Sequence, residues 1–323
     1  MTKYKVIFDT DPGVDDMMAL FMMAGHADID IVALTTTYGN ASIETTTRNA
    51  LFLADMLTLV LGQKIPVYQG VHKPIMYDND PNYADFVHGV DGLGDTGMNI
   101  PSYTPETHIT AAEYIVKTVR DNPHEITLVA VGPLGNVSLA MMLDPQLPAL
   151  CKDIFIMGCS FYHPGNITPS AEANTYNSPH ETDIVFGGNW SNTSGVVGLD
   201  VTCSVPLSQS YLKDLTSTGI LGQKMWDMAK FYLKFYETVY HEKSLHCHDA
   251  FAVAMMTNPE IFTTKAGAIR VVTDGISRGQ TVITDPTSGD KNGDWNRPKI
   301  NVAIDVDGDA FRKLFANCIR RLP

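Results

Sequence analysis

The sequence predicts an α/β fold: a mostly parallel, doubly wound sheet flanked by helices, with a helical segment toward the C-terminal half. Three observations predict it. Short apolar runs alternate with stretches whose apolar residues recur at helical spacing, loops rich in Gly, Asp, Asn or Pro separate them, and this order repeats along the chain. The chain has 323 residues, 44% of them hydrophobic, and no clear linker, so we expect residues 1–323 to form a single domain.

The first strand, loop and helix contain the densest group of acidic residues. Residues 6–8 are a short apolar run, and residues 9–16 read Asp-Thr-Asp-Pro-Gly-Val-Asp-Asp. Met17, Leu20 and Phe21 then recur at helical spacing after the Pro-Gly turn. We therefore predict a buried strand, an acidic loop and a helix, in that order.

The same order continues downstream. We predict strands at residues 29–34, 65–68, 126–131, 154–157 and 196–200, and helices at residues 42–61 and 110–122. Residues 204–258 look largely helical and contain an aromatic stripe formed by Trp226, Phe231, Tyr232, Phe235 and Tyr236. We interpret this stripe as core or oligomer packing, with a lid over a site as the alternative. Ligands bind beyond the carboxyl ends of such strands, so one crevice is expected to contain Asp11, Asn40, Val131 and Met157.

Composition excludes several classes of partner. No apolar run reaches the roughly 18 residues that span a bilayer, and the chain opens on a short strand, so we expect a cytoplasmic protein without a membrane partner. Five cysteines without a CxxC pair indicate reduced thiols rather than disulfides or a zinc knuckle. A formal net charge of −13 argues against nucleic acid, whose binding depends on neutralising phosphates.

The acidic loop predicts a metal site. Four carboxylates fall within eight residues, at Asp9, Asp11, Asp15 and Asp16, and would repel one another without a cation. Helix capping is the alternative, but it accounts for only one or two of them. A hard divalent cation such as Ca²⁺ accounts for the set, because it takes six to eight oxygen ligands, and the loop offers no thiolate or imidazole.

The surroundings of this loop point to an uncharged ligand. Residues 6–47 and residues 153–212 contain no Lys or Arg. Phosphate recognition usually recruits these side chains, so a neutral polyol such as ribose fits better than a sugar phosphate. Residues 165–174 add carboxylate and amide groups suited to sugar hydroxyls, although a simple turn loop is the alternative. His248 and Asp249 precede an apolar helical run, where Asp249 has the alternative role of an N-cap.

Together these motifs resemble the inosine-uridine-preferring nucleoside hydrolases. The most specific match is the Asp-Thr-Asp-Pro-Gly-Val-Asp-Asp opening. The resemblance extends in the same order through nearly the whole chain, at residues 38–40, 88–89, 131–136, 157–158, 165–174 and 248–249. It implies a calcium-dependent enzyme that hydrolyses the N-glycosidic bond of purine or pyrimidine ribonucleosides to ribose and free base, in an α/β nucleoside hydrolase fold that forms homodimers or homotetramers.

The resemblance also implies a role for individual residues. The carboxylates of Asp11, Asp16 and Asp249 and the carbonyl of Val131 would bind Ca²⁺, and Asp11 would activate a metal-bound water. His248 would assist the leaving base, because a histidine titrates near neutrality, and His88 could help it. The residues expected around the ribonucleoside are Asp15, Asn40, Met157, Asn166, Glu172, Asn174 and His248.

This sequence departs from the family pattern at three places. Cys159 stands where a second Gly is usual, residues 178–180 read Ser-Pro-His in place of Asp-Pro-Glu, and Ala173 and Gly135 replace an aromatic residue and a Thr. Two other functions remain open: a metal-dependent phosphohydrolase, favoured weakly by the Asp-x-Asp at a strand end, and a ribonucleoside-binding protein without turnover. The sequence leaves the choice between purine and pyrimidine bases open.

Overall fold

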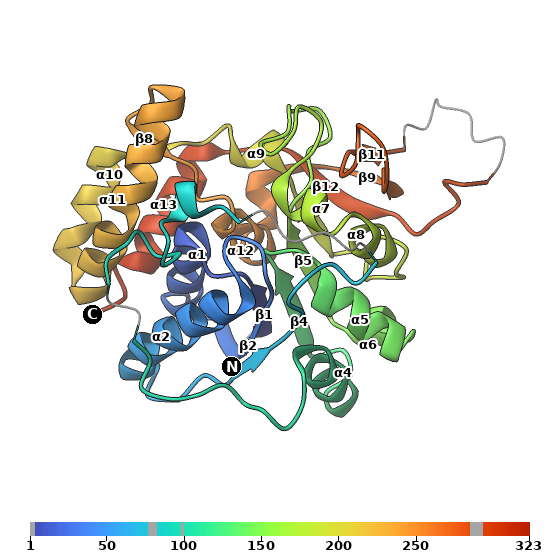
Figure 1. Cartoon of the computed structure of the whole chain (residues 1–323), viewed down its shortest axis with the longest axis horizontal. Helices are drawn as coiled ribbons and strands as arrows, with labels where there is room; N and C mark the ends of the chain where they lie inside the picture. The colour runs from blue at the N-terminus through green and yellow to red at the C-terminus, as the bar shows by residue number, and fades with distance from the viewer. Residues whose placement is uncertain (1–3, 77–82, 98–99, 285–292) are drawn as a thin grey trace.

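The computed structural model describes residues 4–76, 83–97, 100–284 and 293–323, and its centre is an eight-stranded sheet (Figure 1). The order across the sheet is β3-β2-β1-β4-β5-β6-β12-β9. The seven strands from β3 to β12 in this order are parallel to one another, and β9 pairs antiparallel with β12 at the edge of the described sheet. Their bounds are β1 Tyr4–Thr10, β2 Ile29–Thr36, β3 Val67–Gln69, β4 Ile126–Ala130, β5 Asp153–Met157, β6 Gly195–Val197, β9 Phe262–Gly267 and β12 Ile300–Val306.

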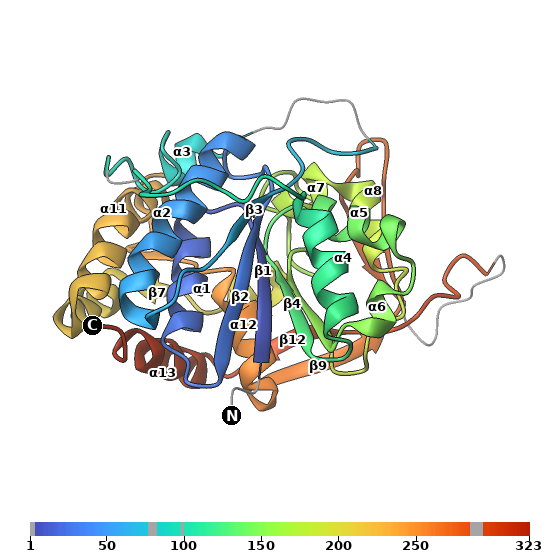
Figure 2. The ribbon, with the colours of Figure 1, turned by 90° about the horizontal axis from the view of Figure 1, so that it is seen from below.

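Helices cover both faces of the sheet, as Figure 2 shows from the side. One face carries α1 Val14–Ala24, α2 Ile43–Leu61, α11 Ile220–Tyr240, α12 Ala250–Thr257 and α13 Gly308–Ile319. The other carries α4 Ala111–Asp121, α5 Gly135–Leu143, α6 Leu147–Leu150 and α8 Pro179–Val185. The central strands are buried on both faces, which explains why they are nearly continuous apolar runs instead of alternating ones. The predicted fold class is confirmed.

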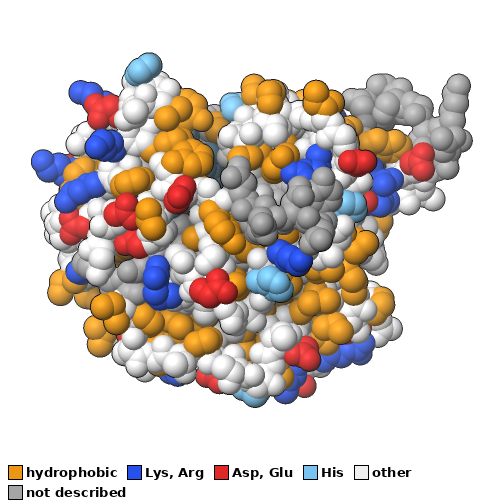
Figure 3. Space-filling model, in the orientation of Figure 1, with side chains coloured by type: hydrophobic (Ala, Val, Ile, Leu, Met, Phe, Trp, Pro, Cys, Tyr) orange, Lys and Arg blue, Asp and Glu red, His pale blue; other side chains and the backbone are white. Residues whose placement is uncertain are grey.

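Smaller elements complete the described chain. The short helices are α3 Asp85–His88, α7 Ala173–Asn177, α9 Leu199–Thr202 and α10 Gln209–Asp214, with 3₁₀ turns η1 Leu215–Thr218 and η2 Pro259–Ile261. Two small antiparallel pairs join β7 Leu207–Ser208 to β8 Ser244–Leu245 and β10 Ile269–Val271 to β11 Thr281–Ile283. On the face drawn in Figure 3, basic and acidic side chains are interspersed. No helix in the described part is long and apolar enough to cross a membrane.

Two details of the predicted elements were wrong. The strand expected at residues 196–200 ends at Val197, because Gly198 starts α9 and Asp200 lies within that helix. The C-terminal region after residue 258, for which we predicted no elements, contains two strands of the main sheet and α13. That residues 1–323 form one domain stays a prediction.

The strand order indicates where on the sheet a ligand would bind. β1 and β4 are neighbours at the centre, and the chain runs outward from β1 through β2 to β3 and from β4 through β5 to β6. Loops that leave the carboxyl ends of β1 and β4 therefore turn to opposite sides, and ligands bind between such loops; we call this region the crevice. The acidic loop follows β1 directly.

Candidate functional site

The crevice at the carboxyl ends of the strands brings four predicted residues together. Asp11 follows β1, and its Oδ2 accepts a hydrogen bond from the backbone N–H of Asn40, after β2, at 2.7 Å. The side-chain amide of Asn174 donates to the carbonyls of Val131 and Met157, at the ends of β4 and β5, at 2.7 and 3.4 Å. A Cβ at Gly132 would lie 2.5 Å from Oδ1 of Asp11, so only glycine allows the backbone after β4 to approach this carboxylate.

Three buried carboxylates meet at the centre of the crevice. Asp15 and Asp16 lie in the first turn of α1, Asp249 lies directly before α12, and one carboxylate oxygen from each falls within 4.8 Å of the others. Burial raises the pKa of Asp15, Asp16 and Asp249 above the ordinary value, and for Asp15 and Asp249 the neighbouring carboxylates raise it further. Ionising all three carboxyls is therefore costly unless a cation lies beside them.

Asp16 is the residue that shapes the loop. Its Oδ1 accepts hydrogen bonds from the Thr10 hydroxyl and the Asp11 N–H, and its Oδ2 accepts from the Gly13 N–H at 2.9 Å and from the Asn40 side chain at 3.0 Å. The bond to Gly13 caps α1, as the alternative interpretation of the acidic loop expected for one or two aspartates. Asp249 has no side-chain capping bond, so capping does not explain its position.

Two carboxylate oxygens at this site lack a donor. Oδ1 of Asp11 and Oδ1 of Asp15 are buried and have no hydrogen-bond partner among the described residues. Such atoms carry a large desolvation cost unless a cation or a ligand donor binds them. An oxygen-only donor set of this kind fits a hard divalent cation, so the aspartate cluster could hold a metal ion. Which of Asp11, Asp15, Asp16, Asp249 and the Val131 carbonyl bind it stays a prediction.

Asp9 does not belong to this group, contrary to our interpretation of four clustered carboxylates. In β1 it pairs in register with Thr35 of β2, whose hydroxyl donates to Asp9 Oδ1 at 2.6 Å. The Asn136 side chain donates to the same oxygen at 2.8 Å. Burial raises the pKa of Asp9 to about 6. The Oδ1 bonds of Asp9 come from β2 and α5, its Oδ2 is buried without a partner among the described residues, and Asp9 lies outside the group formed by Asp15, Asp16 and Asp249.

The sugar side of the predicted site is formed by the segment before α7. Glu172 caps α7: its Oε1 accepts from the Asn174 N–H at 2.8 Å, and its Oε2 accepts from the Thr175 and Cys159 N–H groups, each at 3.0 Å. Asn166 is exposed and accepts a hydrogen bond from the Ala173 N–H at 2.9 Å. Of the predicted ribose ligands here, Asn174 is therefore the one whose amide reaches the ends of β4 and β5.

The departures from the family pattern have defined positions. Cys159 adopts φ +78°, a conformation that glycine adopts without strain, and is fully buried. The Ser178 hydroxyl donates to the Asn174 carbonyl at 3.0 Å and accepts from the Leu134 N–H at 3.1 Å. Ser178 thus ties α7 to the loop after β4, and the exchange of Asp for Ser leaves this segment anchored.

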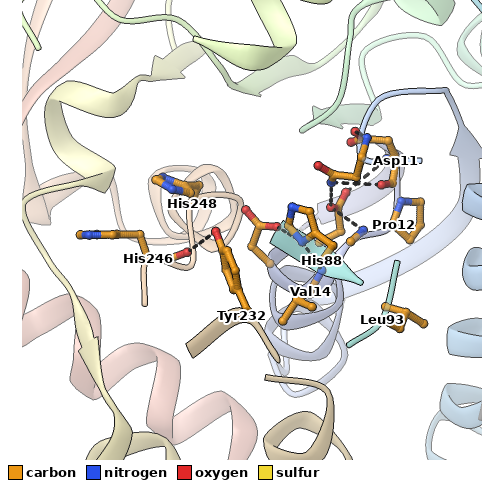
Figure 4. A network of polar contacts seen from close by, with 12 residues as sticks. Asp11, Pro12, Val14, His88, Leu93, Tyr232, His246 and His248 are labelled. Atoms are coloured by element: carbon orange, nitrogen blue, oxygen red, sulfur yellow. Dashed lines mark hydrogen bonds and ion pairs between the residues drawn. The ribbon is translucent and has the colours of Figure 1, made fainter. Parts of the chain in front are cut away.

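Histidines and tyrosines form the opposite side (Figure 4). His248 Nδ1 lies 2.7 Å from the Thr202 hydroxyl, and its Nε2 lies 3.3 Å from the Tyr236 hydroxyl. The Tyr236 hydroxyl lies 3.4 Å from that of Tyr232, which donates to the His246 carbonyl at 3.2 Å. Burial, and then the neighbouring His246 and His88, lower the pKa of His248 well below its ordinary value, so the ring is neutral at neutral pH.

His88 connects the two sides. Its ring centre lies 5.1 Å from that of Tyr232, and its Nδ1 lies 3.9 Å from Oδ1 of Asp15. The Val14 N–H donates to Nδ1 at 3.2 Å, and burial lowers the pKa of His88 to about 3. A neutral ring that accepts at Nδ1 carries its proton on Nε2, so His88 offers an N–H donor.

Tyr232 and Tyr236 are the site residues that sequence reasoning missed. We had assigned the aromatic stripe of α11 to packing, and both residues are indeed buried. Their hydroxyls, however, are part of the hydrogen-bonded chain that reaches His248. Two tyrosines four residues apart on one helical face, with a polar end on each, were the available signal.

Comparison with known proteins gives matches over most of the chain. Residues 6–313 match the family model described as inosine-uridine preferring nucleoside hydrolase. A probable uridine nucleosidase 2 from Oryza sativa subsp. japonica is 40% identical over 87% of this chain and 82% of its own length. The inosine-uridine preferring nucleoside hydrolase of Leishmania major is 32% identical over 98% of both chains. A solved plant nucleoside hydrolase superposes with a TM-score of 0.93 at 34% identity, over 98% of this chain and 99% of that one.

Proposed function

Because the chain belongs to the inosine-uridine preferring nucleoside hydrolase family, we propose that it is a calcium-dependent ribonucleoside hydrolase that accepts uridine. The observation that carries this proposal is the arrangement of the crevice. Buried carboxylates with unbonded oxygens lie on one side, and a histidine linked to two tyrosines lies on the other. Breaking an N-glycosidic bond develops positive charge on the ribose and negative charge on the base, and each charge needs a separate partner.

The carboxylate side suits the sugar and the attacking water. Burial raises the pKa of Asp11, and its Oδ1 has no donor among the described residues, so this oxygen can accept a proton from water. Asp15 and Asp249 would stabilise an oxocarbenium-like ribose by their charge. Ca²⁺ held by Asp16, Asp249, Asp11 and the Val131 carbonyl would lower the pKa of the attacking water and attract the sugar hydroxyls.

The ribose would be held between α7 and the loops after β1, β2 and β5. Asn174 reaches the crevice from α7, and Asn40 contacts both Asp11 and Asp16. Asp15 Oδ1 is available to accept a hydroxyl. Met157, buried at the end of β5, offers an apolar surface for the ring. Asn166 and Glu172, the other two predicted ribose ligands, would act by holding the backbone of the segment that carries Asn174.

The histidine side suits the leaving base. Burial keeps His248 neutral in the free protein, but negative charge that develops on a base beside it would favour the protonated ring. The Tyr236 hydroxyl lies within hydrogen-bond distance of Nε2, and because burial raises its pKa it would keep its proton and orient the ring. His88 would support the base as a neutral N–H donor. The His248 ring would take up a proton from solvent and pass it to the base as the bond breaks.

Uridine is proposed because several relatives of more than 35% identity are named uridine nucleosidases. One solved neighbour is named a purine-preferring ribonucleoside hydrolase, from Gardnerella vaginalis, at 29% identity and a TM-score of 0.88. We therefore include inosine as a second substrate to test. A homodimer or homotetramer and a cytoplasmic location remain predictions of the sequence.

The direct test measures reducing sugar released from uridine, cytidine, inosine, adenosine and guanosine without phosphate. We expect ribose release with Ca²⁺ present, and its loss after chelation with recovery when Ca²⁺ is restored. Hydrolysis of p-nitrophenyl phosphate with Mg²⁺, and no ribose release, would favour the phosphohydrolase. Tight uridine or inosine binding without any free base would favour a binding protein.

A further inference from the structure

The loop after β5 carries no predicted ligand of its own between Ser160 and Pro164, yet side chains from two distant elements hold its backbone. Asp200 of α9 and Thr281 of β11 supply these contacts. The loop connects β5, which ends at Met157, to the segment that carries Glu172 and Asn174.

Asp200 binds three consecutive backbone amides. Its Oδ2 accepts from the Phe161 N–H at 2.9 Å, and its Oδ1 accepts from the N–H groups of Tyr162 at 2.5 Å and His163 at 3.0 Å. Charge-assisted hydrogen bonds of this kind are about twice as strong as neutral ones. The three amides fix the direction in which the chain leaves Ser160.

Thr281 holds the preceding residue from the other side. Its hydroxyl accepts from the Ser160 N–H at 3.1 Å and donates to the Ser160 carbonyl at 2.8 Å. Thr281 is 2% exposed and Ser160 is 4% exposed, so water cannot replace either bond. One hydroxyl thus satisfies both backbone groups of a buried residue.

The residue before Ser160 connects these contacts to the segment proposed to hold the sugar. Ser160 follows Cys159, whose N–H donates to Glu172 Oε2 and whose carbonyl accepts from the Leu199 N–H at 3.0 Å. Cys159 has φ +78°, a conformation that a non-glycine residue keeps only where its surroundings fix it. A shift of Ser160 would therefore move the amide that holds the Glu172 carboxylate, and with it the cap of α7 and Asn174.

Helix α9, which carries Asp200, also reaches the leaving-group side. α9 contains Asp200 and, two residues later, Thr202, whose hydroxyl lies 2.7 Å from His248 Nδ1. The four-residue helix α9 therefore connects the loop that supports α7 to the His248 ring, which is proposed to face the base. Among the described residues, the hydrogen bonds of Asp200 and Thr281 go to the backbone of residues 160–163 and not to the three-aspartate cluster.

We propose that Asp200 and Thr281 are positioning residues, which hold the loop after β5 so that the segment carrying Glu172 and Asn174 meets the ribose. This inference rests on the proposed hydrolase function. Thr281 sets the loop through Ser160, and Asp200 sets both the loop and the helix that carries Thr202. Loss of the Thr281 hydroxyl should weaken the hold on ribose and leave the metal site unchanged.

The test compares Thr281→Val, which keeps the shape and loses the hydroxyl, with Thr281→Ser, which keeps the hydroxyl. We expect Thr281→Val to raise KM for uridine on the order of tenfold with a smaller fall in kcat, because misplaced binding groups cost both affinity and rate. Thr281→Ser should stay within about twofold of wild type. Because the segment that the loop positions is proposed to hold ribose, Thr281→Val should affect uridine and p-nitrophenyl riboside equally. Affinity for Ca²⁺ alone, by calorimetry, should not change.

Thr58→Val is the matched control for a general loss of stability, since the Thr58 hydroxyl donates to the Ala54 carbonyl within α2, far from the loop. It should leave KM unchanged. A Thr281→Val enzyme with wild-type KM, or a Thr281→Ser enzyme as impaired as Thr281→Val, would overturn the inference while wild-type ribose release still upholds the hydrolase.

A second readout does not depend on turnover. In wild type the amides of residues 160–163 should exchange slowly with deuterium, and both Thr281→Val and Asp200→Asn should accelerate their exchange at least about tenfold relative to other loops. Asn at 200 has one acceptor oxygen where Asp has two, and its amide group would face backbone N–H donors. Unchanged exchange in both variants would refute the positioning role even if the wild-type protein released no ribose.

Discussion

Asp144, which follows α5, and Asp15, in the first turn of α1, are almost equally hidden from solvent, at 6% and 7% exposure. Arg120 donates two hydrogen bonds to Asp144, at 2.7 and 2.8 Å, and these bonds hold the pKa of Asp144 below its usual value. Asp15 has an unbonded Oδ1, and burial and the charge of Asp16 raise its pKa. Asp144 has a counter-charge in Arg120, and Asp15 has no Lys or Arg partner among the described residues.

The difference indicates what the crevice is for. Grouped buried carboxylates destabilise a protein unless a positive charge offsets them. Residues 6–47 contain no Lys or Arg to supply that charge. We therefore attribute the cluster around Asp15 to the proposed function, whereas the Arg120–Asp144 pair belongs to the local structure of α4 and α5. Substitutions in the two regions should consequently affect different properties.

The largest difference should appear in turnover. Asp11→Ala should lower kcat for uridine at least about 10³-fold, because the proposed water-activating carboxylate and a neighbour of the ion are lost together. Asp144→Asn removes a charge at an equally hidden position and should leave kcat within about twofold while lowering the melting temperature. Circular dichroism would establish that Asp11→Ala is folded. Near-wild-type kcat in the folded variant would eliminate the proposed role of Asp11.

A smaller effect on turnover should distinguish the histidine side of the crevice from its carboxylate side. His248→Ala should reduce hydrolysis of uridine about 10²-fold, and that of p-nitrophenyl riboside far less, because nitrophenolate leaves without protonation. Steady-state kinetics on both substrates measures the ratio. Equal losses on the two substrates would remove His248 from the leaving-group role and assign it to general support of the site.

The fold was predictable from sequence where the pattern is local. β1, β2, β4 and β5 are buried apolar runs followed by polar loops, so periodicity located them, and the family resemblance that the comparisons confirm added the order. β9 lies at the edge of the sheet and exposes Thr and Lys side chains, so it gives a weak apolar signal. Its antiparallel pairing with β12 depends on contacts about 40 residues apart, as the register of the two strands shows.

The site was predictable only in part for the same reason. Asp15 and Asp16 are adjacent in the acidic motif, but the approach of Asp249 depends on how α12 packs against α1, which no local pattern encodes. Asp9 was misassigned because its partner Thr35 lies on the neighbouring strand. Tyr232 and Tyr236 were read as packing because a buried tyrosine serves the core with its ring and the site with its hydroxyl.

Removing a carboxylate from the crevice should raise the melting temperature of the metal-free protein, whereas removing one from the Arg120 region should lower it. Asp15→Asn relieves repulsion in the metal-free protein, so with a chelator present its melting temperature should rise by about 2–4 °C. With excess Ca²⁺ the order should reverse, because wild type binds the ion more tightly and gains more stability from it. Differential scanning calorimetry under both conditions tests this. A lower melting temperature for Asp15→Asn in chelator would mean that the cluster is stabilising by itself.

The smallest effect should come from Arg120→Ala, which removes the partner of Asp144 and leaves the crevice untouched. We expect it to lower the free energy of unfolding only slightly at pH 7, because Arg120 is half exposed and water screens the pair. The folded-state pKa of Asp144 is lowered, so this contribution is present above the unfolded value of about 4 and is lost as pH falls through the folded value. Urea titrations of both proteins should therefore differ at pH 7 and converge at strongly acid pH, whereas kcat for uridine stays unchanged. A difference that persisted at acid pH would show that Arg120 acts by packing its side chain and not by its charge.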